Sequence, residues 1–286
     1  MTEHLKQIGS LLRQTFIEWI QLKPGLIGAA LAFYIIFSLG PILVITIGFV
    51  GAFYGEKVAG SQIVHEINTI AGPKPAEVMR LLIKKTFAPP SSTIATILSF
   101  PLVAFGAGMF FFQLKRTLNI IWGARPVEEH FLKSFFRSYL LSFLMVVSLG
   151  LMLYILVIKS LTLAMLQDLI QYYIPIPRYV LQTVDFIMTF GVITILFGII
   201  YGFLPNVRIK ISEVWTGAGV TSLLFTSTQF LTGVYISHTE IDTAYGAIGS
   251  LTVIFIWIFY SSLIFLYGAV FTKVFACRHG RPHLPK

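Results

Sequence analysis

Charged residues are very unevenly distributed along this chain of 286 residues. They leave six uninterrupted uncharged stretches, each longer than 20 residues, and a helix needs about 20 mainly apolar residues to cross a bilayer. The sequence therefore predicts an all-α integral membrane protein with six transmembrane helices. The expected spans are about 26–53, 92–122, 136–158, 181–204, 213–237 and 246–275, within a transmembrane domain of residues 23–276.

The composition supports this class of protein. Hydrophobic residues make up 56% of the chain and charged residues 12%, whereas soluble domains carry about 25% charged residues. A membrane β-barrel would show segments of about ten residues that alternate between polar and apolar, and the apolar stretch 251–260 does not alternate. The single cysteine, Cys277, cannot form an intramolecular disulfide or a multi-thiolate metal site.

Lysine and arginine in the loops predict the orientation of the chain. With both termini in the cytoplasm, 14 of the 21 basic residues lie on the inner side and 7 on the outer side. Five of these seven fall in the first outer loop, which disagrees with the rest of the pattern. The basic residues of the other loops favour this orientation, so we predict that both termini are cytoplasmic.

Three segments outside the spans have their own patterns. Residues 1–22 form an amphipathic helix, with apolar residues at helical spacing, which either lies in the inner membrane interface or packs on the bundle as a solvated helix. Residues 56–87 predict two short amphipathic helices that cap the outer face and are interrupted near Gly72 and Pro73. Residues 277–286 form a basic cytoplasmic tail.

The second and fifth spans carry the polar residues of most interest. A helix over 92–122 is about 45 Å long at 1.5 Å per residue, so its last turns should protrude into the cytoplasm. Lys115 and Arg116 there are either membrane anchors or attract an anionic headgroup. The fifth span is rich in Ser and Thr, with Gln229 near its middle; such groups either hold helices together or line a wet cavity.

Few residues suggest chemistry. No metal, nucleotide or dinucleotide motif appears in the sequence, so we expect no cofactor, no metal, no catalytic residue and no enzymatic activity. Asp185, with Lys159 as its candidate partner, is the ionisable residue expected nearest to membrane depth. Pro41 and Pro101 fall inside the first and second spans and should kink or loosen them.

Five segments together carry a family resemblance: residues 30–41 (ALAFYIIFSLGP), 113–122 (QLKRTLNIIW), 203–206 (FLPN), 214–218 (VWTGA) and 245–250 (YGAIGS). They resemble the YihY/virulence factor BrkB family of bacterial inner-membrane proteins, some of whose members were formerly labelled ribonuclease BN. The last span resembles the family's through Trp257, Tyr260 and Gly268. The family often has an acidic residue where this chain has Val270, so a mechanism that needs this carboxylate is not expected here.

The resemblance implies a multi-pass protein of the bacterial cytoplasmic (inner) membrane. Members of the family have been linked to serum resistance, labelled as a transfer-RNA ribonuclease, and suggested to move lipids or envelope precursors. Phosphodiester hydrolysis usually needs clustered carboxylates or histidines that hold metal ions. Beyond the N-terminal segment, the inner loops contribute only Glu128, Glu129, His130 and Glu213, so the ribonuclease is the minor alternative.

We therefore expect a translocator or flippase-like carrier of a lipid or another amphipathic anionic envelope molecule. The alternative is a non-transporting scaffold or accessory subunit in envelope biogenesis. Expected partners are membrane lipids, with a homo-oligomer or an envelope-biogenesis partner also considered, and no nucleic acid. A cavity would be walled by the first, second and fifth spans, with Lys84 and Lys85 at its outer mouth. The candidate cavity or headgroup contacts are Tyr34, Ser38, Pro41, Lys115, Arg116, Asn119, Trp122, Asp185, Asn206, Gln229 and Tyr245.

Overall fold

The structure, a computed structural model, describes residues 2–86, 109–124, 178–237 and 242–278, together with residues 151, 154–156, 158 and 162. The helices in this part are α1 (Thr2–Gln21), α2 (Pro24–Tyr54), α3 (Glu56–Ala71), α4 (Pro73–Thr86), α7 (Arg178–Phe203), α8 (Ile211–Ser237) and α9 (Asp242–Arg278). A further helix covers 109–122. The described residues contain no β-strand, so the all-α prediction is confirmed for this part of the chain.

In the part of the chain that the structure describes, two helical segments are long and apolar enough to cross a membrane, Thr183–Phe203 in α7 and Ile254–Arg278 in α9. The pair Lys6–Gln21 and Pro24–Leu39 meets the same test when taken together, but it is bent by 72°. The predicted spans 92–122 and 136–158 lie largely outside the described residues. Six spans therefore stay a prediction.

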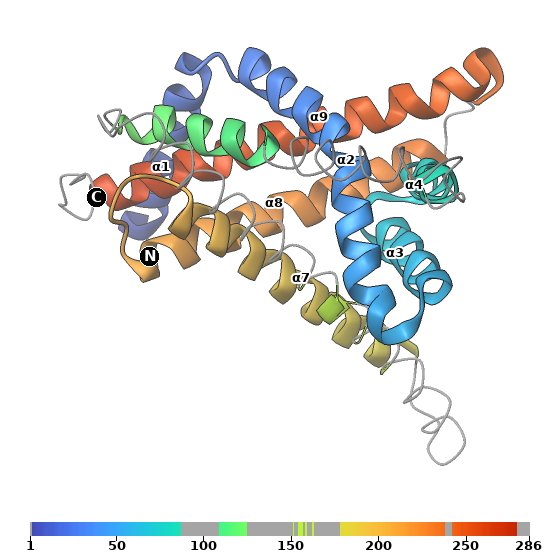
Figure 1. Cartoon of the computed structure of the whole chain (residues 1–286). Helices are drawn as coiled ribbons and strands as arrows, with labels where there is room; N and C mark the ends of the chain where they lie inside the picture. Colours follow the sequence, from blue (N-terminus) through green and yellow to red (C-terminus); the bar gives the residue numbers. More distant parts are fainter. Residues whose placement is uncertain are drawn as a thin grey trace.

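The bend between α1 and α2 has a local cause in the sequence. Proline disfavours the right-handed helical conformation in the residue before it, and Lys23, which precedes Pro24, adopts the left-handed conformation with φ 52°. Pro24 then begins α2, a position where its missing N–H costs no helical hydrogen bond. α2 stays helical through Pro41, and Figure 1 shows it changing direction partway along its length.

α3 and α4 are the two short helices expected within residues 56–87. Gly72, with φ 91°, separates them at the predicted break. They pack on each other and on α2, and α4 also reaches α9. The small core that joins α2, α3 and α4 consists of Leu43, Ile47, Ala59, Ile63 and Met79.

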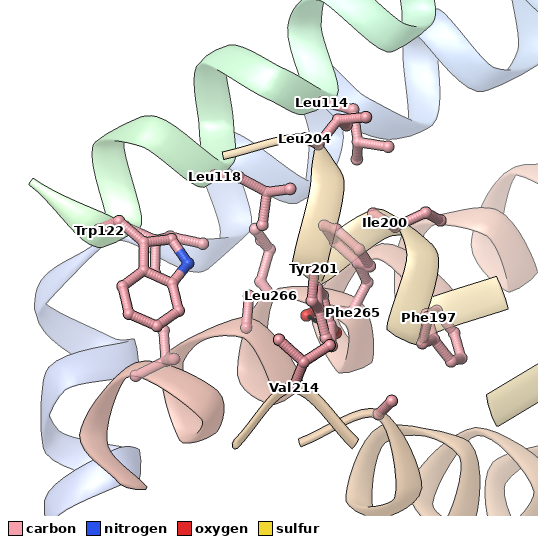
Figure 2. Close-up of a cluster of buried hydrophobic side chains, with 14 of the residues drawn as sticks. Leu114, Leu118, Trp122, Phe197, Ile200, Tyr201, Leu204, Val214, Phe265 and Leu266 are labelled. Atoms are coloured by element: carbon pink, nitrogen blue, oxygen red, sulfur yellow. Dashed lines mark hydrogen bonds between the residues drawn. The ribbon is translucent and has the colours of Figure 1, made fainter. Parts of the chain in front are cut away.

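The larger core lies between α7, α8, α9 and helix 109–122. Figure 2 shows side chains from all four helices in it, with the Tyr201 ring of α7 beside Phe265 of α9. The Tyr201 hydroxyl donates a hydrogen bond to the Phe265 carbonyl at 2.8 Å, and it lies 3.2 Å from the Thr221 hydroxyl of α8. A polar cross-link of this kind fixes the mutual position of three helices inside an apolar core.

α8 and α9 approach each other through two reciprocal pairs. A Cβ on Gly217 of α8 would meet the Thr272 side chain of α9, and a Cβ on Gly268 of α9 would meet Thr221 of α8. Each threonine lies four residues after the glycine of its own helix and donates its hydroxyl to that glycine's carbonyl at 2.7 Å. Small residues at a helix interface let two backbones come close, and here the threonines fill the space.

Candidate functional site

The C-terminal part of helix 109–122, the link between α7 and α8, the start of α8 and the C-terminal part of α9 meet at one end of the molecule, at the left of Figure 1. α1 packs against α9 at this end. α3 and α4 lie towards the opposite end. The predicted site residues that the structure brings together, Asn119 and Asn206, lie at this end.

Asn119 and Asn206 are joined across 87 positions of the sequence. The backbone N–H of Asn206 donates a hydrogen bond to the Asn119 side-chain oxygen at 2.8 Å. Two buried side chains on either side of Asn206, Leu204 and Val207, anchor the link to the large core. The carboxamide of Asn119 therefore holds the α7–α8 link in place by accepting a backbone N–H that lies outside both helices.

Three exposed cations lie within four residues of Asn119 or Asn206 along the chain, and we call them the basic rim: Arg116, Arg208 and Lys210. Arg116 precedes Asn119 by one helical turn, and Arg208 follows Asn206 by two residues. Within the part of the chain that the structure describes, none of the three side chains makes an ion pair. Positive charge is thus left available for an anion at this end.

Glu213 is the acidic residue nearest in sequence to the basic rim, and its carboxylate has a structural role. It is 6% exposed and accepts the backbone N–H of Lys210 at 3.3 Å. An acidic residue in the first turn of a helix both caps free N–H groups and complements the positive end of the helix dipole. Glu213 therefore stabilises the start of α8.

α1 is fastened to the end of α9 by a set of polar contacts that we call the α1–α9 latch. Lys273 pairs with Glu18 at 3.1 Å. The Arg278 guanidinium donates to the Gln14 side chain at 3.0 and 3.1 Å, to the Ser10 hydroxyl at 2.8 Å and to the Gln7 carbonyl at 3.2 Å. One helix face of α1 is thereby turned towards α9.

The other predicted site residues lie in different surroundings. Trp122 is 3% exposed and belongs to the large core. Ser38 is fully buried and donates to the Ile35 carbonyl of its own helix, and Tyr34 is half-buried with its ring against Phe33. Lys115 is half-buried on helix 109–122.

Asp185 does not join the basic rim. It is half-buried in α7, about 27 Å along the helix from Phe203 at 1.5 Å per residue. Its expected partner Lys159, and Pro101 of the second span, lie outside the described residues. The backbones of Pro41, Lys85, Gln229 and Tyr245 lie in α2, α4, α8 and α9, but their side chains are outside what the structure describes.

Five hydroxyls of α8 are bonded to the backbone of their own helix. Each of them donates to the carbonyl four residues earlier: Thr216, Thr221, Ser222, Thr226 and Ser227. Thr221 and Ser222 are also fully buried. Of the two roles left open by the sequence, these two residues have the packing role and do not line a wet surface.

Glu66 is the residue that sequence reasoning missed. It is 2% exposed in α3, the helix that supplies Ala59 and Ile63 to the small core. The signal was present in the spacing, because Ala59, Ile63 and Glu66 recur at intervals of four and three residues and so share one helix face. Among the described residues, no group of three or more His, Cys, Asp and Glu could hold a metal ion.

Known proteins resemble this chain over most of its length. The sequence model of a family described as Virulence factor BrkB matches residues 22–285. A UPF0761 membrane protein of Coxiella burnetii (strain RSA 493 / Nine Mile phase I) is 27% identical over 254 residues, which cover 87% of this chain and 86% of the relative. A UPF0761 membrane protein of Pseudoalteromonas translucida is 24% identical over 297 residues, covering 95% and 90%. No solved structure is significantly similar to this chain.

Proposed function

Because this chain belongs to the virulence factor BrkB family of membrane proteins, we propose that it carries a lipid or another amphipathic anionic envelope molecule across the bacterial inner membrane. The observation that carries the proposal is the basic rim. Its three exposed cations stand on two segments that the Asn119–Asn206 hydrogen bond ties together.

The chemistry of the basic rim suits an anionic headgroup. Near an anionic lipid surface each Lys or Arg contributes about 1 kcal/mol, and an arginine guanidinium presents a planar fork of donors that fits phosphate oxygens. The two arginines and Lys210 together offer enough donors for one phosphate group. We propose that the headgroup binds here first.

Exposed apolar side chains lie near the rim residues in the sequence. Ile120 on helix 109–122 is 53% exposed, and Phe203 and Ile211, at the two ends of the α7–α8 link, are 67% and 75% exposed. Large exposed apolar side chains in a membrane protein face lipid chains. An amphiphile could therefore place its charge on the rim and its chains against these residues, and a free phosphate would use the rim alone.

We propose the following membrane arrangement. Six helices span the inner membrane, both termini lie in the cytoplasm, and the basic rim faces the cytoplasm, as the distribution of basic residues favours. Cysteine labelling in intact cells tests this at the C-terminal tail and at residues 240–243. Labelling of the tail by an impermeant reagent added outside would refute the orientation.

We also propose that the protein is not an enzyme and binds no nucleic acid. The sequence carries no nucleotide-binding motif that could power a pump, so movement would be downhill exchange or be driven by a partner protein. The cavity for the cargo would lie between the first, second and fifth spans.

Reconstitution of the purified chain into liposomes tests the transport proposal. Fluorescent anionic and zwitterionic lipids are placed in both leaflets, and a membrane-impermeant reductant quenches the outer ones. We expect faster loss of the protected signal with protein, more so for the anionic lipid. The combined variant Arg116→Gln, Arg208→Gln and Lys210→Gln should slow it, whereas Arg116→Lys, Arg208→Lys and Lys210→Arg, which keep the charge, should not.

The second candidate function is a non-transporting scaffold. It is favoured by the interlocked core of α7, α8 and α9, where reciprocal Gly–Thr pairs and buried hydroxyls bonded to their own helix leave a rigid unit. Scrambling no faster than in protein-free vesicles, for anionic and zwitterionic lipids alike, would refute transport and favour the scaffold.

A further inference from the structure

One face of α1 carries an exposed apolar row, formed by Ile8, Leu12, Phe16 and Ile20. These side chains are 55%, 42%, 50% and 52% exposed. Residues four apart in a helix are neighbours on its surface, so the row runs along most of the helix. Four large apolar side chains in a continuous line form a surface that water does not favour.

The row is exposed although α1 is firmly docked. The α1–α9 latch holds one side of the helix, with the Glu18–Lys273 pair and the Arg278 contacts. On the docked side, Thr15 is fully buried and Leu11 packs on the large core. The docked side of α1 thus combines polar contacts with packing of Leu11 and Trp19 on the large core, and the apolar row faces outwards.

The direction of α1 fits a helix that lies along a membrane surface. The segment Lys6–Gln21 makes an angle of 72° with Pro24–Leu39 of α2. If residues 24–39 of α2 lie along the membrane normal, α1 lies much closer to the membrane plane than to the membrane normal. The bend occurs at Lys23, whose left-handed backbone conformation joins the end of α1 to the start of α2.

The charges around the row complement an anionic surface. Lys6 and Arg13 are exposed, lie seven residues apart on one edge of the row, and make no ion pair within the described part of the chain. The first turns of α2 also expose large apolar side chains, with Leu26 and Phe33 73% and 50% exposed. An interfacial helix buries its apolar face at the boundary between headgroups and acyl chains and keeps its cations among the headgroups.

We propose that α1 is an in-plane lipid-binding helix. Its apolar row enters the leaflet at the end of the bundle where α9 ends, and Lys6 and Arg13 bind anionic headgroups there. The α1–α9 latch fixes the rotation of the helix about its own axis, so that the row and not the polar side faces the acyl chains. This role is independent of whether the protein moves lipid.

Spin labels on the full-length chain test the proposal. In a Cys277→Ser background, Leu12→Cys, Phe16→Cys and Ile20→Cys are labelled one at a time, and Gln21→Cys, an exposed position away from the row, is the matched control. The protein is reconstituted into vesicles of phosphatidylethanolamine and phosphatidylglycerol. We expect the three row labels to be more accessible to oxygen than to a water-soluble nickel complex, and the Gln21→Cys label to show the reverse.

Two outcomes would overturn the proposal. Greater nickel accessibility along the row would mean that it faces water, and low accessibility to both reagents would mean that a second copy or another protein covers it. Size-exclusion chromatography of each labelled variant checks that the chain is folded.

The charge part of the proposal has its own test. With a label at Phe16→Cys, the added changes Lys6→Gln and Arg13→Gln should reduce the measured depth in vesicles that contain phosphatidylglycerol and leave it unchanged in pure phosphatidylcholine. No change in the anionic vesicles, or an equal change in both, would refute a contact with anionic headgroups.

Discussion

Replacing Gly217 by alanine would test how closely α8 and α9 approach. A Cβ at this position would meet the hydroxyl of Thr272 and would lie 2.8 Å from the Thr272 Cβ and 3.0 Å from its Cγ2. Carbon atoms in favourable contact are about 3.5–4.0 Å apart, so the helices would have to separate by about 1 Å there. Rotation of the Thr272 side chain cannot relieve this contact, because its Cβ is fixed by the backbone.

The magnitude follows from a comparison with Gly219, two residues further along α8. A Cβ on Gly219 would meet nothing within 4 Å. Both substitutions gain about 1 kcal/mol of helix propensity, so this contribution cancels between the two variants. The difference in the free energy of unfolding should then be the overpacking cost, about 1–3 kcal/mol, with Gly217→Ala the less stable.

Thermal unfolding of the purified chain in detergent, followed by fluorescence-detected size exclusion, measures this difference. We expect a lower Tm for Gly217→Ala than for Gly219→Ala. Adding Thr272→Ala should recover only part of the loss, because it removes the hydroxyl and methyl but keeps the Cβ at 2.8 Å. A Tm for Gly217→Ala equal to or above that of Gly219→Ala would refute the close approach.

Three further substitutions can be followed in the same assay. Asn119→Ala should destabilise the protein by about 1–3 kcal/mol because it leaves the Asn206 N–H without its acceptor, whereas Asn206→Ala keeps this N–H and should cost less. Lys23→Gly should raise stability by about 1 kcal/mol, since glycine adopts the left-handed conformation without the steric penalty, and Lys23→Val should lower it. Tyr201→Phe should cost about 1 kcal/mol by removing the hydroxyl bonded to the Phe265 carbonyl.

Each of these has a result that would contradict it. Equal losses of stability for Asn119→Ala and Asn206→Ala would mean that the hydrogen bond accepted by the Asn119 side chain does not stabilise the protein. A less stable Lys23→Gly variant would show that the lysine contributes contacts that outweigh its backbone conformation. An unchanged Tm for Tyr201→Phe would mean that the buried hydroxyl does not help to hold α7 against α9.

The positions of the long helices followed from the sequence alone. α2, α7, α8 and α9 begin and end within four residues of the segments expected from the uncharged stretches. Helix length and hydropathy are local properties, and so are the interruptions at Lys23-Pro24 and Gly72-Pro73. The positively charged loops and the family resemblance were equally readable without coordinates.

The tertiary structure decided which surfaces meet. Hydropathy cannot distinguish a face that packs on another helix from one that faces lipid, because both are apolar in a membrane protein. The burial of Glu66, the bond between Asn119 and Asn206, and the fit of Gly217 against Thr272 all depend on segments far apart in the chain. The orientation of α1 also depends on distant segments. Its sequence shows an apolar and a polar face, and the contacts of Arg278 and Lys273 in α9 determine which side of the helix is turned to the protein.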